Sequence, residues 1–190
     1  MTSHTHASRR LHTHRPAWVL VAALALLAFV PVGRAEVDVS KLQAIVTAPG
    51  GAEQEQQAAK ELARYLKKMY GVDLPVEARK DIGPNTSGVI LVGQTAALAA
   101  RAVTEAEVRK VRHDGYVIGA GDGRLFVAGP RPIATLFGAA GLLEHLGARF
   151  YGFTETVPAN TDKTVADFRP SDKPAFEFRS TSTSAWRRKN

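Results

Sequence analysis

The sequence predicts an α/β (α+β) sandwich, in which a mixed, partly antiparallel sheet is covered on one face by two main helices. Two segments, residues 52–70 and 133–146, carry apolar residues at spacings of three and four, which is the helical period. An Asp-Gly pair at 122–123 separates two apolar runs, a pattern typical of a β-hairpin. The compact apolar run at 89–92 fits a buried central strand.

Strands and helices alternate in the first half of this region. Residues 42–48 (LQAIVTA) form a candidate strand, which the Pro-Gly-Gly of residues 49–51 ends. The helix predicted over 52–70 begins with acidic residues, which favour the positive end of the helix dipole, and Gly71 suits its C-terminal cap. Its apolar stripe comprises Ala58, Leu62, Tyr65, Leu66 and Met69.

Shorter elements follow this helix. Residues 74–77 indicate an edge strand, because Pro75 cannot donate a hydrogen bond to a neighbouring strand. After a loop at 83–88 and the strand at 89–92, residues 96–102 predict a short helix. The spacing of Thr104 and Glu107 is that of a capping box, so another helix is expected to end near residue 111.

A hairpin, a helix and a strand are predicted next. Residues 116–118 and 125–128 supply the two hairpin strands. The next helix is expected to end at Gly147 and to cover the sheet with one face. That face comprises Ile133, Leu136, Phe137, Ala140, Leu143 and Leu146. Residues 148–151 indicate a return strand, a polar connector follows Pro158, and residues 175–179 alternate like a final strand.

Residues 1–35 have the composition of a signal peptide. Arginines precede an apolar run at 17–30, and small residues at Gly33 and Ala35 suit cleavage before Glu36. The run has 14 residues, whereas a membrane-spanning helix needs about 20. We expect a secreted or periplasmic protein with no membrane attachment after cleavage; an uncleaved anchor is the alternative. Because the chain contains no Cys, it has no disulfide, thiolate metal site or lipid-attachment cysteine.

The net charge of +7 gives no reason to expect nucleic-acid binding. Residues 1–35 contain four of the 25 basic residues and no acidic ones, so the remainder has a net charge of only +3. Four of the six His also lie in that segment, and His113 and His145 lack the spacing of metal ligands. We therefore expect no metal and no cofactor.

Several loop residues are candidates for binding. The glycine-rich residues 119–123 could suit a phosphate, but a strand follows them instead of a helix, which favours the hairpin. Arg131 precedes the second main helix as a possible anion ligand, with a rigid connector as the alternative. Glu155 is a conspicuous loop carboxylate without an evident catalytic partner, and Glu144 and His145 form a further polar pair. We take Arg131 and Glu155 as candidates for a loop or a domain interface.

Three aromatic residues, Tyr151, Phe153 and Trp186, could stack on a sugar ring, which presents apolar C–H groups to a flat aromatic face. Core packing is the more ordinary role for Tyr151 and Phe153, whereas Trp186 lies in a basic, polar tail. Trp186 therefore remains a candidate for binding substrate.

The order of these segments resembles a known domain. It is carried by AAKELARYLKKMYGVDLPV, GVILVG, DGYVIGAGDGRLFVAGPRPIATLFGAAGLLEHLGARFYGFTETVP and KPAFEFRS. Residues 42–179 are similar to the N-terminal domain that precedes the catalytic barrel in secreted alpha-glucuronidase-like glycoside hydrolases, and to the corresponding domain of bacterial beta-hexosaminidases. The resemblance implies a non-catalytic domain followed by a (β/α)₈ barrel. It also implies that Arg179 contacts substrate hydroxyls, although Ser180 and Thr181 replace the glycine and carboxylate of that motif.

We accordingly expect a signal peptide at 1–35, the accessory domain at 36–170, and the start of a missing or truncated barrel at 171–190. A barrel needs roughly 200 residues or more, and 11 residues follow Arg179. The expected function is that of an accessory domain in polysaccharide or xylan degradation, inactive by itself. Its expected partners are a glycan and a separately encoded catalytic barrel. The alternatives are a stand-alone carbohydrate-binding protein and an inert fragment of a truncated gene.

Overall fold

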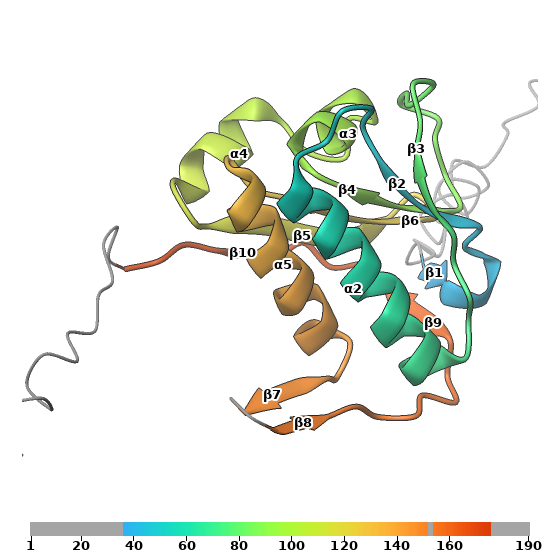
Figure 1. The fold of residues 1–190 in the computed structure, drawn as a ribbon. Coiled ribbons are helices and arrows are strands. Elements are labelled where there is room, and N and C mark those ends of the chain that lie inside the picture. The colour runs from blue at the N-terminus through green and yellow to red at the C-terminus, as the bar shows by residue number, and fades with distance from the viewer. Residues whose placement is uncertain (1–35, 152–153, 176–190) are drawn as a thin grey trace, which may run out of the picture. The chain divides into compact units, whose positions relative to one another are not determined.

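A six-stranded mixed sheet lies at the centre of the fold (Figure 1). The computed structural model describes residues 36–151 and 154–175. Along the sheet the order of strands is β10-β5-β6-β4-β2-β3. The strands are β2 (Ala44–Thr47), β3 (Val76–Ala78), β4 (Val89–Val92), β5 (Tyr116–Gly121), β6 (Arg124–Ala128) and β10 (Ser171–Asp172). Strands β3, β2, β4 and β6 are parallel, whereas β5 runs antiparallel to both β6 and β10.

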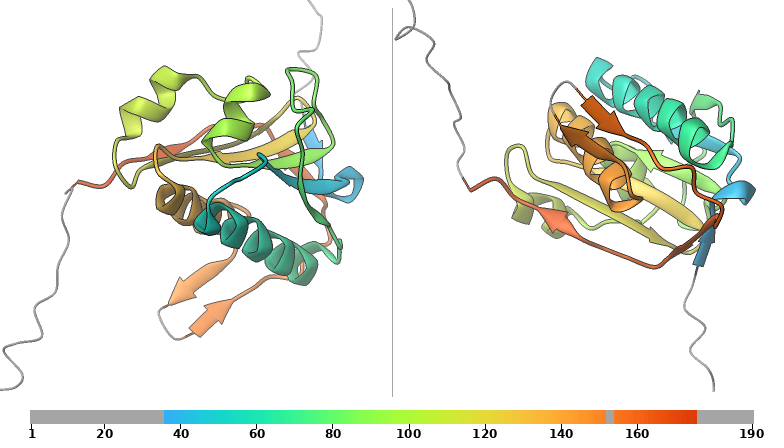
Figure 2. Two further views of the ribbon diagram at one scale, coloured as in Figure 1. Left: turned by 45° about the horizontal axis from the view of Figure 1, so that its top comes forward. Right: turned by 90° about the horizontal axis from the view of Figure 1, so that it is seen from below.

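Helices cover both faces of the sheet. The long helices α2 (Glu53–Tyr70) and α5 (Pro132–His145) lie together on one face (Figure 2). The short helices α3 (Gln94–Ala99) and α4 (Glu105–Val111) lie on the other. The predicted sandwich, with a mixed sheet and two main helices on one face, is therefore confirmed.

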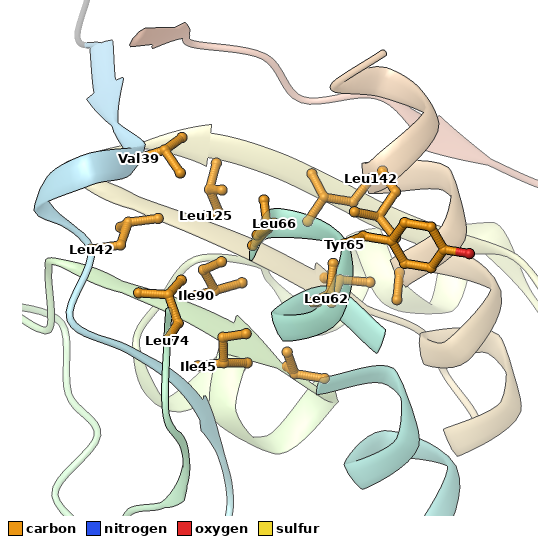
Figure 3. Close-up of a cluster of buried hydrophobic side chains, with 14 of the residues drawn as sticks. Val39, Leu42, Ile45, Leu62, Tyr65, Leu66, Leu74, Ile90, Leu125 and Leu142 are labelled. Carbon is orange, nitrogen blue, oxygen red and sulfur yellow. The ribbon is translucent and has the colours of Figure 1, made fainter. Parts of the chain in front are cut away.

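The core on the α2–α5 face is made by branched side chains of the sheet that meet the apolar stripe of α2 (Figure 3). Ile45, Ile90 and Leu125 come from the strands β2, β4 and β6, and each is fully buried. The register explains why they form one patch, because Ile45 pairs with Ile90 and Ile90 pairs with Leu125. Leu62 and Leu66 of α2 cover this patch. Burying each such side chain stabilises the fold by roughly 1.5–3 kcal/mol.

The ends of α2 follow the sequence signals closely. At the start of the helix, the Glu55 carboxylate accepts a hydrogen bond of 3.2 Å from the backbone N–H of Ala52. This N–H has no partner within the helix, so the side chain satisfies it. Gly71 ends the helix with a φ of 69°, the left-handed conformation that glycine adopts without steric cost.

The hairpin of β5 and β6 is also confirmed. Asp122 and Gly123 form its turn with φ values of 51° and 68°, so both central residues are left-handed. Gly119 faces the ring of Phe126, and a Cβ at Gly119 would lie only 2.5 Å from that ring. The glycine-rich stretch therefore serves strand packing, and no helix begins there to bind a phosphate.

The predicted contact face of α5 is only partly correct: Leu143 is buried in the core and Leu136 and Leu146 pack against it, but other members of that face do not. Phe137 of that face is 47% exposed and Ala140 is exposed too. The sheet is instead contacted by small residues, because Gly138 and Gly141 lie against Tyr116 of β5. The buried residues of α5 are Ala134, Thr135, Gly138, Ala139, Gly141, Leu142 and Leu143. The helix is apolar almost all round, so its spacing does not select a face, and the small residues allow the closest approach to the sheet.

Two small sheets complete the fold. Strand β1 (Glu36–Asp38) leads into a short 3₁₀ turn and pairs with β9 (Thr164–Ala166), and β7 (Arg149–Tyr151) pairs with β8 (Thr154–Thr156). The return strand at 148–151 therefore exists but does not join the six-stranded sheet. The connector after Pro158 contains strands β9 and β10, which its polar composition does not predict. Most of the strand expected at 175–179 lies outside the described residues.

Candidate functional site

An apolar groove lies between α2 and α5, beside Phe150 of strand β7. It encloses about 240 Å³, and we call it the α2–α5 groove. Its main lining residues are Tyr65, Leu136, Phe137, Ala140, Leu143 and Phe150. Because the small residues of α5 face the sheet, the large side chains Leu136 and Phe137 are left for this groove.

Tyr65 of α2 forms one wall of the groove. Its ring meets the ring of Phe150 edge to face, with centroids 5.3 Å apart and an interplanar angle of 88°. Its hydroxyl points away from the buried cluster (Figure 3) and donates a hydrogen bond to the Glu155 carboxylate. The guanidinium of Arg64 lies 4.4 Å from the centroid of the Tyr65 ring.

Glu155 lies on strand β8, so the prediction of a loop position is wrong. Its carboxylate connects the β7–β8 hairpin to helix α2. Besides the Tyr65 hydroxyl, it binds the ammonium group of Lys68 at 2.8 Å. The Lys68 hydrogen bond, followed by that of Tyr65, holds the pKa of Glu155 below its ordinary value. The hydrogen bond to Glu155, together with burial, raises the pKa of Tyr65. Glu155 is therefore held ionised, which is the opposite of what a general acid needs.

The groove has the chemistry of a contact surface. Glycosidic hydrolysis needs two carboxyl groups that face one bond across a defined gap. The other carboxylate along the groove, Glu61, is already in an ion pair of 2.5 Å with Arg64. Glu61, which lines the groove, and Glu155, which binds the wall residue Tyr65, therefore both stabilise local structure. The groove itself is mainly apolar, with charged side chains beside it.

Arg131 occupies the N-cap position of α5 but makes no side-chain cap hydrogen bond. Its guanidinium forms an ion pair with Asp114, in the turn between α4 and β5. The Arg131 side chain is 53% exposed, so it remains accessible at the surface. The structure thus places Arg131 and Glu155 in separate clusters, each with a charged partner.

The other sequence candidates contribute less. Tyr151 is 65% exposed, so its expected core role is wrong. Phe153, Arg179 and Trp186 lie outside the described residues. His145 stacks on Phe168 with ring centroids 3.9 Å apart.

The part of the chain that the structure describes contains neither a group of metal ligands nor a membrane-spanning helix. Within residues 36–151 and 154–175, no three His, Cys, Asp or Glu side chains are grouped to hold a metal ion. In the same residues, no helix has the length and apolarity required to cross a membrane.

Arg169 was missed by sequence reasoning. It binds the two carboxylate oxygens of Glu107 at 2.9 and 3.1 Å and the carbonyl of Ala102 at 2.7 Å, and it lies 5.2 Å from the centroid of the Phe126 ring. The Arg169 hydrogen bond lowers the pKa of Glu107 to about 2. Capping-box spacing identified Glu107 but carried no information on a partner 62 positions away.

Three solved structures have a similar fold. A GH115 4-O-methyl-α-glucuronidase with specificity for decorated arabinogalactans is 17% identical with a TM-score of 0.56, and the match covers 75% of this chain and 19% of that one. The GH20 β-N-acetylhexosaminidase of Streptomyces coelicolor A3(2) is 17% identical with a TM-score of 0.51, covering 76% and 24%. CpGH84D is 14% identical with a TM-score of 0.50, covering 76% and 22%. The chain thus spans about a fifth to a quarter of the length of these proteins.

The fold is therefore one that glycoside hydrolases carry as a minor part of a longer chain. A search of curated proteins found no match. The family model described as glycosyl hydrolase family 67 N-terminus matches residues 27–141, which is more than half of the chain. The chain belongs to this family.

Proposed function

We propose that the chain is a non-catalytic accessory domain of an alpha-glucuronidase-like glycoside hydrolase that degrades polysaccharides such as xylan. We further propose that its α2–α5 groove packs against the catalytic domain of that hydrolase. The family membership and the solved structures of similar fold support this proposal.

The exposure of Phe137 is the observation that carries the proposal. A phenylalanine that is 47% exposed in the middle of a long helix leaves apolar area in contact with water. Leu136 and Phe150, both partly exposed, line the same groove, and apolar side chains that gather in an exposed groove support a role in contact with another protein surface. Lys68 and Glu155 supply a charged rim, and an apolar centre with a polar rim is typical of protein interfaces.

A catalytic domain is the occupant that best fits the comparisons. The proteins of similar fold contain four to five times as much chain as the part that matches, so in them this fold lies within a larger protein. Contacts between domains of one chain are extensive and partly apolar, and the groove provides a surface of this kind.

A binding experiment tests the docking proposal. The full chain is titrated with the isolated (β/α)₈ catalytic domain of a family 67 glycosyl hydrolase in a calorimeter. We expect saturable binding, weakened by about tenfold or more in Phe137→Glu because a charge then enters the apolar centre. The matched control is Val76→Glu, which changes an apolar residue of similar exposure, 39%, on strand β3. An absence of binding, or equal weakening by both variants, contradicts the proposal.

A second experiment tests the lack of catalysis. The purified chain is incubated with aryl glycosides and glucuronoxylan oligosaccharides, and released sugar is measured. We expect no turnover, since both carboxylates at the groove are occupied by Lys68, Tyr65 or Arg64. Turnover by the purified chain disproves the non-catalytic role.

We also propose that residues 1–35 direct export to the periplasm or the medium. The support is compositional: arginines, then a 14-residue apolar run, then small residues at Gly33 and Ala35. N-terminal sequencing of the protein expressed in a bacterium tests this. A mature chain beginning at Glu36 is expected, and an intact Met1 in the exported protein contradicts cleavage.

A further inference from the structure

A second and larger cavity lies on another side of α5. It measures about 480 Å³, which is within the range of small-molecule sites. It is bounded by the C-terminal half of α5, strand β5 and the segment that leads into β10. None of its lining residues belongs to the α2–α5 groove. The cavity and the groove are therefore distinct pockets, although both adjoin the C-terminal half of α5.

An aromatic ring lines the inner side of this cavity. Tyr116 of β5 is half-buried, and its side chain lies along α5 over Gly138 and Gly141. A Cβ at Gly141 would lie only 2.4 Å from the Tyr116 hydroxyl oxygen, so the glycine is what lets the ring lie so close to the helix. Ile118 and Pro170 continue the apolar lining beside the ring.

Carboxylates stand on two sides of this apolar surface. Glu144 comes from α5 and Asp172 from β10. Both line the same cavity as Tyr116, and Asp172 is paired with Tyr116 in the register of β10 and β5. Burial is the main cause that raises the pKa of Tyr116, and the two negative charges add to it. Within the described part of the chain, neither carboxylate has a hydrogen bond or an ion pair. Their oxygens are therefore available to accept hydrogen bonds from a ligand.

The basic residue of the cavity is already engaged. Arg149 donates hydrogen bonds of 2.6 and 2.7 Å to the carbonyls of Glu144 and Ala148, at the C-terminal end of α5. His145 stacks on Phe168. The lining thus offers a ligand an aromatic ring and acceptor oxygens. The Arg149 guanidinium is instead bound to carbonyls at the end of α5, where a positive charge is favourable.

This combination selects a class of ligand. A phosphate or carboxylate would meet two negative charges, and the described residues around the cavity provide too few grouped ligands for a metal ion. A pyranose fits both features, since its apolar C–H face can lie on the aromatic ring while its hydroxyls donate to carboxylates. We propose that this cavity binds one pyranose unit of a neutral glycan, with Tyr116 beneath the sugar ring and Glu144 and Asp172 accepting from its hydroxyls.

Nuclear magnetic resonance on the full chain tests the site directly. Xylotriose, cellotriose and triacetylchitotriose are each added up to about 10 mM, a range suited to the weak binding expected of a single subsite. We expect at least one of them to shift the backbone amide signals of Gly141, Ser171 and Asp172 in a saturable way. Xylitol, an acyclic polyol, should leave these signals in place. If no oligosaccharide shifts them, or if xylitol shifts them equally, the proposal is wrong.

Charge-removing variants test the roles of the carboxylates. Glu144→Gln and Asp172→Asn keep the shape of the side chain, and each should weaken binding by about tenfold because a charge-assisted hydrogen bond is lost. Tyr116→Phe keeps the ring and should bind nearly as well as the natural chain. Glu105→Gln, on α4 across the sheet, is the matched control. Unchanged binding in both Glu144→Gln and Asp172→Asn overturns the proposal.

The two proposals can fail independently. Phe137→Glu changes the groove and should leave the oligosaccharide-induced shifts unaltered. Glu144→Gln changes the cavity and should leave binding of the catalytic domain unaltered. Loss of both kinds of binding in either variant would contradict the separation of the two sites.

Discussion

The hydroxyl of Tyr65 donates a hydrogen bond to the carboxylate of Glu155, which joins helix α2 to strand β8 across 90 positions of sequence. The same carboxylate binds Lys68, one helical turn further along α2. These contacts hold the β7–β8 hairpin beside the α2–α5 groove, so the shape of the groove depends on them.

Tyr65→Phe should lower the free energy of unfolding by about 1 kcal/mol. The variant keeps the edge-to-face contact with Phe150 and loses only the hydrogen bond to Glu155. Urea denaturation followed by circular dichroism measures the change. In a double-mutant cycle, Glu155→Gln should cost less in the Tyr65→Phe background than in the natural chain, because only the ion pair with Lys68 is then left to lose. Fully additive effects would show that the two groups do not interact.

Acid should weaken the attachment of the 168–172 segment to α4. The pKa of Glu107 is about 2, below its ordinary value of 4.5, because Arg169 binds the ionised carboxylate. A lowered folded-state pKa contributes stability that is complete above pH 4.5 and is lost as the pH falls from 4.5 towards 2. Glu107→Gln keeps the capping-box geometry without the charge, so its unfolding free energy should fall less between pH 6 and pH 3. An unchanged pH dependence contradicts this assignment.

Arg112→Gly should stabilise the chain by about 1 kcal/mol. Arg112 ends α4 with φ of 53° and ψ of 169°, a conformation that glycine adopts readily and other residues adopt at a cost. The control is Arg109→Gly, inside the same helix, which should destabilise by about 1 kcal/mol. Thermal unfolding compares the two. Destabilisation by both variants would mean that the Arg112 side chain contributes more than its backbone conformation costs.

Gly141→Ala should destabilise the chain by about 1–3 kcal/mol, because the added methyl group overlaps the Tyr116 hydroxyl at the helix–sheet contact. Ala140→Ser changes the adjacent, exposed position and should alter the free energy of unfolding by less than about 0.5 kcal/mol. Equal stability of Gly141→Ala and the natural chain would show that Tyr116 moves aside without cost.

Local patterns were enough to predict the main elements. Helix α2 has a clear apolar stripe and Gly71 at its end, and the hairpin turn has the residues that a left-handed turn requires. The contact face of α5 could be predicted only in part, because that helix is apolar on most sides and its small residues decide the face only by close packing. Strands β9 and β10 are short and polar, and they form only because β1 and β5 offer them partners.

The candidate site was predicted less well than the fold. Glu155 was identified as a carboxylate, but its partners Tyr65 and Lys68 lie on an element far away in the sequence. The same holds for Arg169 and Glu107. The groove itself follows from which side of α5 faces the sheet, so the partly incorrect face also concealed the exposed Phe137.

The short outer strand β3 affects how the protein can associate with copies of itself. β3 has only three residues, and Pro75 before it has no N–H to donate, although its carbonyl accepts from Ile45 at 2.8 Å. Such an edge is a poor template for strands of another molecule, and this limits growth of the sheet into fibrils. If copies of this domain self-associate at high concentration, the helical surface around Phe137 is the expected point of contact, and a glutamate there should keep the protein dispersed.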